Sequence, residues 1–192
     1  MQNVVVIRPG ATEFDEQGRF KGILDLPLSE RGLQQVAQMA VELRRVRIDR
    51  FYAAPGTAAQ QTVTRVAEGR GAAVIMEEEL RNLDHGLWHG RLVEDVRRTQ
   101  PRLYRLWQED AQRFHPPHGE SWLEGRRRVE RLLQRLDRLR GQETLALVVA
   151  EPLASIVQQV LGDERSVDVW QVSCLAGRWN LIQRVSQPQH SA

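Results

Sequence analysis

The sequence predicts an α/β protein, a three-layer α/β/α sandwich with a mostly parallel central sheet. Two observations lead to this prediction. Continuous runs of aliphatic residues, as at positions 4–7 and 144–149, have glycine or proline near their ends, which is typical of strands buried on both faces. Longer segments with apolar residues at helical spacing separate these runs, so strands and helices alternate along the chain.

Three strands and two helices are expected in the first half of the chain. In order, they are a strand at 4–7, a helix at 29–46, a strand at 49–53, a helix at 57–68 and a strand at 72–76. Ser29 is expected to cap the first helix, whose apolar face runs from Val36 to Leu43. Gly69 and Gly71 are expected to end the second helix.

The second half is expected to hold a loop region, two helices and three strands. In order, they are a loop with short helices at 80–118 that covers the sheet, a helix at 121–140, a strand at 144–149, a helix at 152–161, and strands at 167–172 and 179–185. Leu132, Leu136 and Leu139 stand at helical spacing in the long helix. We expect a single domain over residues 1–186, followed by a disordered tail at 187–192.

Composition restricts the partners and the compartment of the protein. No window approaches 18 consecutive apolar residues, and no secretory signal begins the sequence, so we expect no membrane association. The single cysteine, Cys174, fits a reducing cytoplasm, and a cytoplasmic protein is expected. Lys21 is the only lysine in the chain. The arginine-rich remainder could bind nucleic acid, but a net charge of +2 is too small an excess for a dedicated nucleic-acid domain.

Short motifs stand in a fixed order between residues 3 and 162. They include Arg-Pro-Gly at 8–10, Gly-Arg-Phe-Lys-Gly at 18–22, Asp-Leu-Pro-Leu-Ser at 25–29, Tyr-Ala-Ala-Pro at 52–55, Gly-Leu-Trp-His-Gly at 86–90 and Pro-Pro-His-Gly-Glu-Ser at 116–121. This series resembles the histidine phosphatase superfamily, the phosphoglycerate mutase-like proteins. One such motif is a weak signal, whereas six in the right order indicate the family fold. The resemblance therefore implies a phosphoglycerate mutase-like sandwich.

The positions to which the resemblance assigns the chemistry hold other residues. Pro9 stands where the family has its nucleophilic histidine, and Ala58 where it has a phosphate-clamping arginine. Asn82 replaces the acidic proton donor, and Glu151 replaces the second histidine. Of the core set only Arg8 matches. Since phosphoryl transfer by this route needs a nucleophile and several cationic donors, these departures predict a pseudoenzyme. Such a protein would bind or regulate a small-molecule or protein partner without phosphoryl-transfer activity.

An alternative function keeps the chemistry but changes the residues. In this hypothesis the protein is a phosphatase or other hydrolase with a remodelled active site, formed by Glu151 and a loop histidine such as His85 or His118. Ligand-binding candidates are therefore Arg8, Gly10, Glu151, His85 and His118. Arg8 has two interpretations, as an anion ligand or as the partner of Glu151 in a buried ion pair, and we favour the ion pair.

The remaining histidine and arginine patterns have ordinary structural explanations. His85 and His89, and likewise His115 and His118, have spacings that could place each pair on one helical face and bind a metal. Glycines and prolines within both segments favour loops instead, so no metal and no cofactor are expected. The arginines of the helix at 121–140 alternate with acidic residues, which favours a salt-bridged, solvated face. The oligomeric state, including a homo-oligomer, is left open.

Overall fold

The computed structural model describes residues 3–109, 115–140, 143–162 and 176–183. Its centre is a five-stranded sheet in the order β3-β2-β4-β1-β5. Four neighbouring strands are parallel: β1 (Asn3–Ile7), β2 (Arg50–Ala53), β3 (Ala73–Met76) and β4 (Leu145–Val148). The fifth, β5 (Trp179–Gln183), runs antiparallel to β1. The prediction of a mostly parallel sheet is confirmed for these strands.

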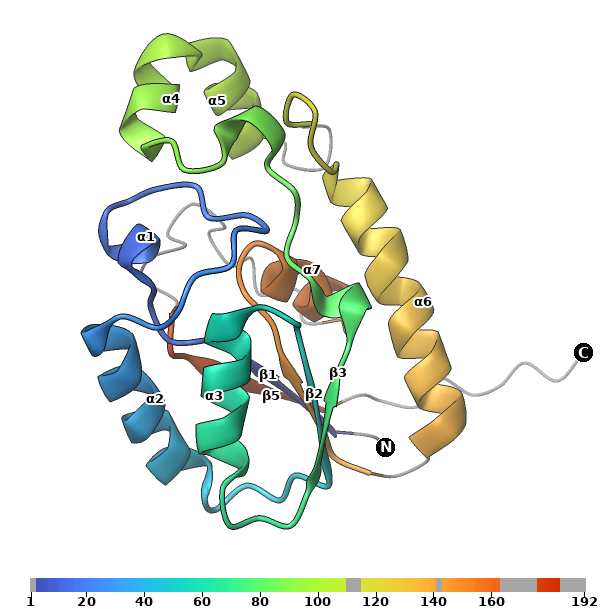
Figure 1. Ribbon diagram of the computed structural model, residues 1–192. Coiled ribbons are helices and arrows are strands. Elements are labelled where there is room, and N and C mark those ends of the chain that lie inside the picture. Colours follow the sequence, from blue (N-terminus) through green and yellow to red (C-terminus); the bar gives the residue numbers. More distant parts are fainter. Residues whose placement is uncertain (1–2, 110–114, 141–142, 163–175, 184–192) are drawn as a thin grey trace, which may run out of the picture.

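Helices lie on both faces of the sheet (Figure 1). On one face α2 (Glu30–Leu43) packs beside α3 (Thr57–Ala67), and on the other α6 (Trp122–Arg140) packs beside α7 (Leu153–Val160). The central strands β1 and β4 are almost fully buried between these two layers. This is the expected three-layer sandwich, and its main apolar core takes residues from all three layers.

Local sequence features explain how the helices begin and end. The hydroxyl of Ser29 accepts a hydrogen bond from the backbone N–H of Gly32 at 3.1 Å, which confirms the predicted cap of α2. The helix ends at Leu43, three residues before the expected end. Gly32 also lets α2 approach the loop after β1, because a Cβ at this position would lie 2.0 Å from the carbonyl oxygen of Ala11. The loop carrying Pro9 is therefore held against α2.

The sequence suggested that the segment from Leu80 to His118 covers the sheet, and this prediction is wrong. It contains the 3₁₀ turns η1 (Glu78–Leu80) and η2 (Gly86–Trp88), and the helices α4 (Val93–Thr99) and α5 (Pro101–Glu109). The last two helices lie beyond the ends of the strands, at the top of Figure 1. A second apolar cluster holds them, formed by Phe20, Trp88, Val96 and Trp107. The aromatic residues of this segment pack with one another and with Phe20, which the sequence alone could not show.

The remaining sequence predictions are confirmed in part. In α6 the expected face at Leu132 and Leu136 is buried, but Leu139, in the last turn, is 60% exposed. Within α6, Arg126 pairs with Glu130 one turn further on at 2.8 Å, as the sequence suggested, whereas Arg128 and Arg135 pair with Glu120 and Glu77 outside the helix. The expected strand at 167–172 and the tail at 187–192 lie outside the described residues. None of the helices in the described ranges is long and apolar enough to cross a membrane.

Candidate functional site

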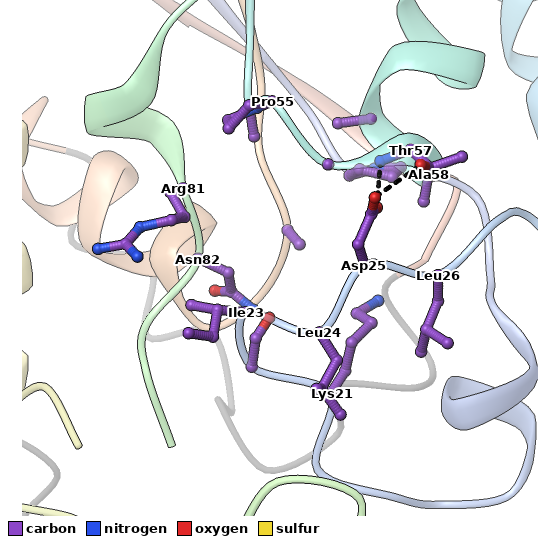
Figure 2. A pocket seen from close by; sticks show the side chains of 16 residues that line it. Lys21, Ile23, Leu24, Asp25, Leu26, Pro55, Thr57, Ala58, Arg81 and Asn82 are labelled. Atoms are coloured by element: carbon purple, nitrogen blue, oxygen red, sulfur yellow. Dashed lines mark hydrogen bonds between the residues drawn. The ribbon is translucent and has the colours of Figure 1, made fainter. Parts of the chain in front are cut away.

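A cavity of about 250 Å³ lies at the carboxyl ends of the parallel strands. The loops after β1, β2 and β4 contribute Pro9, Pro55 and Ala150 to its wall, and Figure 2 shows it from close by. Ligand sites of open α/β sheets are commonly found at this edge. Three of the four family-equivalent positions, at Pro9, Ala58 and Asn82, line this first cavity.

The carboxylate of Asp25 is bound to the amino terminus of α3, at the edge of the first cavity. Asp25 accepts hydrogen bonds from the backbone N–H of Thr57 at 2.6 Å and from its hydroxyl at 3.0 Å (Figure 2). A helix amino terminus favours negative charge, and here an internal side chain supplies it. A phosphoryl group bound at this place would have to compete with Asp25.

Asn82 acts as a structural link between three segments. Its amide nitrogen donates to the carbonyl oxygens of Gly22 at 3.2 Å and of Glu151 at 2.8 Å, and its side-chain oxygen accepts from the N–H of Leu153 at 3.4 Å. The side chain is buried and its donors and acceptor are used. Asn82 therefore holds the loop at 18–22 against the turn that follows β4.

Arg8 forms a buried polar network on the side of α7 and β5. Its Nε donates to Oε1 of Glu151 at 2.6 Å, Nη1 to the side-chain oxygen of Asn180 at 2.7 Å, and Nη2 to that of Gln158 at 2.5 Å. The ion pair expected between Arg8 and Glu151 is present, with both side chains at most 3% exposed. The hydroxyl of Ser155 donates to the second oxygen of Glu151 at 2.7 Å. Arg8 lines neither cavity described here, and its donors are directed to protein groups.

A second cavity, of about 200 Å³, adjoins the first and shares Lys21 and Gly22 with it. Its wall includes Glu151, His85 and Arg19, together with the aromatic side chains of Phe20 and Trp107 from the second apolar cluster. Two of the sequence-derived ligand candidates, Glu151 and His85, are thus brought to one cavity.

His85 is a buried histidine whose imidazole has no polar partner. The residue is 7% exposed, and neither ring nitrogen has a hydrogen-bond partner among the described residues. Phe20 packs against it edge to face, with ring centroids 5.5 Å apart. Its backbone N–H donates to Nε2 of His89 at 3.1 Å, which fixes the loop but leaves the ring unused. An unsatisfied buried imidazole is uncommon in native structures, which makes His85 a candidate functional residue.

The pKa of His85 is lowered to about 4, mainly by burial and to a smaller extent by the neighbouring His89, while Asp84 acts in the opposite direction. The ring is therefore neutral at pH 7. A neutral imidazole keeps the lone pair that a nucleophile needs.

The pKa of His85 leads to a prediction about stability and pH. In the unfolded chain this histidine takes up a proton near pH 6.5, and in the folded chain only near pH 4. Its contribution to the free energy of unfolding is therefore complete above pH 6.5 and is lost as the pH falls toward 4. The full contribution is about 3 kcal/mol. Between pH 7 and pH 4.5, the unfolding free energy of the wild type should fall by roughly 2 kcal/mol more than that of His85→Leu. Parallel pH profiles from urea titrations would contradict the buried, neutral state of His85.

Lys21 is a site residue that the sequence analysis did not select. Its Nζ contacts both carboxylate oxygens of Asp15, at 2.7 and 3.0 Å, and the side chain lines both cavities. Asp15 is held in turn by the backbone N–H and hydroxyl of Thr12, each at 2.8 Å. The available signal was that the only lysine of an arginine-rich chain lies inside one of the family-like motifs.

Two further ligand candidates do not reach the cavities. His118 is exposed on the loop before α6, with a φ of 59°, and lines neither of them. Gly10 donates its N–H to the hydroxyl of Thr62 at 3.3 Å and packs against Gly32, so it serves the contact between the loop and α2. Within the described ranges, no group of three or more histidine, cysteine, aspartate or glutamate side chains is placed to hold a metal ion.

Comparison with known proteins establishes the family. Residues 4–183 match the model of the histidine phosphatase superfamily, branch 1. The chain belongs to this superfamily. It is 30% identical over 183 residues to phosphoserine phosphatase 1 of Hydrogenobacter thermophilus, covering 95% of this chain and 86% of the relative. It is 28% identical over 177 residues to the adenosylcobalamin/alpha-ribazole phosphatase of Salmonella typhimurium, covering 92% of this chain and 88% of the relative.

Solved structures of superfamily members support the fold assignment. A mycobacterial glucosyl-3-phosphoglycerate phosphatase, in complex with VO3, superimposes with a TM-score of 0.82 at 24% identity. The match covers 94% of this chain and 92% of that structure. At this identity the likeness shows the fold, and the phosphoglycerate mutase-like sandwich expected from the motifs is confirmed.

These comparisons contradict the expectation of a pseudoenzyme. The relatives that match nearly the whole chain carry the names of phosphatases, which points to phosphatase activity. The expectation rested on the four positions to which the resemblance assigns the family's chemistry, at Pro9, Ala58, Asn82 and Glu151. It did not take into account the second cavity, which adjoins the first and is lined by Lys21 and His85.

Proposed function

We propose that this member of the histidine phosphatase superfamily hydrolyses phosphate monoesters of small molecules in a remodelled active site. The nucleophile is His85, in the second cavity, in place of the histidine that the resemblance assigns to the position of Pro9. The observation that carries the proposal is the imidazole of His85, which is buried, neutral and without a hydrogen-bond partner among the described residues, and which lines the same cavity as Lys21. A phosphatase of this superfamily needs such a nitrogen, and proline cannot supply it.

The proposed reaction has two steps. A ring nitrogen of His85 attacks phosphorus, the bond from phosphorus to the ester oxygen breaks, and the departing alcohol takes a proton from water. Water then attacks the phosphohistidine and releases inorganic phosphate together with the free imidazole. Both nitrogens are covered in the described structure. The ring therefore turns about its side-chain bonds on substrate binding so that one nitrogen faces the cavity, since catalytic contacts often tighten only in the complex.

Cationic side chains of the second cavity hold the phosphoryl oxygens in this proposal. Lys21 exchanges part of its contact with Asp15 for a contact with phosphate, and Arg19 extends the positive charge along the same wall. Glu151 has a positioning role, because its carboxylate is bound by Arg8 and Ser155. It is not available as a base, which differs from the role given to it in the sequence-based hypothesis.

The lining of the first cavity agrees with a reaction that takes place in the second cavity. The first cavity has neither the nucleophile nor the arginine clamp of the family pattern, and Asp25 occupies the amino terminus of α3. The alcohol part of the substrate can extend into this space past Lys21, which lines both cavities. We keep the single domain at 1–186 and the cytoplasmic location as predictions.

Turnover of a substrate panel tests the proposed function. The names of the relatives suggest phosphoserine and alpha-ribazole phosphate, and p-nitrophenyl phosphate serves as a general probe. We expect release of inorganic phosphate from at least one of these at a kcat of about 1 s⁻¹ or more, within the usual range for enzymes. An enzyme prepared in parallel with Lys21→Met should show a raised KM. Release no faster than in protein-free buffer for every substrate would refute the proposal.

A further inference from the structure

A third cavity, larger than the two near Lys21, lies far from the candidate active site. It has a volume of about 430 Å³ and lies between the C-terminal halves of α2 and α3. Both helices begin near the carboxyl ends of the strands and run away from them, so this third cavity is at the opposite end of the sheet (Figure 1). Its volume is in the range of small-molecule sites, whereas the two cavities near Lys21 are smaller.

The lining of the third cavity is positively charged. Arg44 comes from the end of α2, and Arg65 and Arg70 come from the end of α3 and the turn after it; Glu68 is the one acidic side chain in the wall. Arg65 pairs with Glu68 at 2.5 Å, but both side chains are more than half exposed. An exposed pair of this kind contributes about 1 kcal/mol or less, so an incoming dianion can displace the carboxylate.

Arg70 is held rigidly at the wall of this cavity. Its Nε donates to the carbonyl oxygen of Val66 at 2.8 Å and its Nη1 to that of Val46 at 3.0 Å. The remaining nitrogen, Nη2, is buried and has no hydrogen-bond partner among the described residues. A guanidinium fixed by two bonds loses little freedom when an anion binds near it, so Arg70 presents its charge at the wall with a small entropy cost.

The rest of the wall is apolar and is formed by small side chains. Ala37, Ala40 and Val41 of α2 face Val66 of α3 across the cavity. A bare inorganic ion would fill only part of this volume and would leave the apolar surface in water. A ligand with one anionic group and a compact organic part would use both kinds of wall.

We propose that the third cavity binds a phosphorylated small molecule by its phosphate group. Arg44 and Arg65 bind the phosphate oxygens, since guanidinium groups match phosphate geometry with paired hydrogen bonds. Arg70, whose Nε and Nη1 are bound to backbone carbonyl oxygens, adds a fixed positive charge at the wall. The site is separate from His85, so it does not depend on the proposed catalytic function.

A phosphate titration followed by NMR tests this site. Inorganic phosphate is added to the ¹⁵N-labelled full chain, against chloride at the same ionic strength, and arginine Nε–H and backbone amide signals are recorded. We expect saturable shifts at residues 40–44 and 65–70. Arg44→Gln combined with Arg65→Gln should weaken this binding about 10-fold or more. Arg45→Gln, an exposed neighbour on the same turn that is not part of the wall, should leave it unchanged.

The map of shifts separates this proposal from the proposed catalytic function. Phosphate bound near Lys21 and His85 would move a different set of signals, whatever happens at the third cavity. Absent or non-saturating shifts at 40–44 and 65–70 would overturn the third site, as would equal binding by the double variant. Loss of binding in Arg45→Gln to the same extent would show a general charge effect and would also overturn it.

Discussion

Replacing His85 with alanine is expected to lower kcat for a phosphate monoester by about 10⁴-fold, because the variant has no nitrogen to accept the phosphoryl group. Turnover is measured as release of inorganic phosphate from the best substrate of the panel. The circular dichroism spectrum and the urea midpoint should show that the variant is folded. Removing the buried, unpaired imidazole also removes an unsatisfied polar group, so a large loss of stability is not expected from polarity alone.

A matched control is a substitution at Pro9, where the resemblance places the family's nucleophile. Pro9→Ala should leave kcat within a few-fold of the wild type, since neither side chain can attack phosphorus. His118→Ala should also be active, because His118 is exposed and outside both cavities near Lys21. Full activity in His85→Ala would contradict the assignment of the nucleophile, even if the protein proved to be a phosphatase.

Replacing Arg8 with methionine is expected to lower the free energy of unfolding by about 3–5 kcal/mol, the usual cost of leaving one member of a buried ion pair without its partner. The change leaves the carboxylate of Glu151 in a region where both side chains are at most 3% exposed, and it removes hydrogen bonds to Gln158 and Asn180. Urea denaturation at pH 7 provides the measurement.

The double variant Arg8→Met with Glu151→Leu distinguishes a buried charge from a packing defect. Removal of both charges should recover a large part of the lost stability, because apolar pairs of similar volume often replace buried ion pairs without penalty. A double variant less stable than Arg8→Met would contradict this account of the network. A loss below about 1 kcal/mol in the single variant would show that the ion pair is not buried in solution.

The main features of the fold could be predicted from local sequence. The aliphatic run before Pro9 predicts a buried parallel strand, and the hydroxyl of Ser29 predicts the start of α2; both are confirmed. The pairing of Arg8 with Glu151 followed from their positions at the ends of two strands, because β1 and β4 are neighbours in the sheet. These predictions depend on periodicity, capping and strand order, which act over short distances or through regular pairing.

The candidate site could not be predicted in the same way, because loop contacts form it. Gly22, with a φ of 54°, lets the loop at 18–22 approach His89 so closely that a Cβ would lie 2.2 Å from Nε2. This approach places Lys21 beside the loop that holds His85. No sequence period describes such a contact. The position of α4 and α5 was missed for a similar reason, since Phe20 joins their cluster from a distant loop.

The interpretation of the positions to which the resemblance assigns the family's chemistry shows a limit of motif comparison. The match of Pro9, Ala58 and Glu151 to the family's catalytic positions stays a prediction. These residues do not indicate what nearby side chains can do, and the phosphatase relatives contradict the inference of lost activity. In the proposed site, two loops that carry Lys21 and His85 supply the groups that react with and bind phosphate, and motif comparison did not select Lys21.

Identification of the phosphorylated residue tests the central claim most directly. The wild-type enzyme is mixed with a ³²P-labelled substrate, quenched within the first turnover, digested and mapped by mass spectrometry under conditions that preserve phosphohistidine. The account predicts one labelled peptide, with phosphate on His85, and no label in His85→Ala. Turnover with the label on any other residue, or turnover without a phosphorylated enzyme, would contradict it.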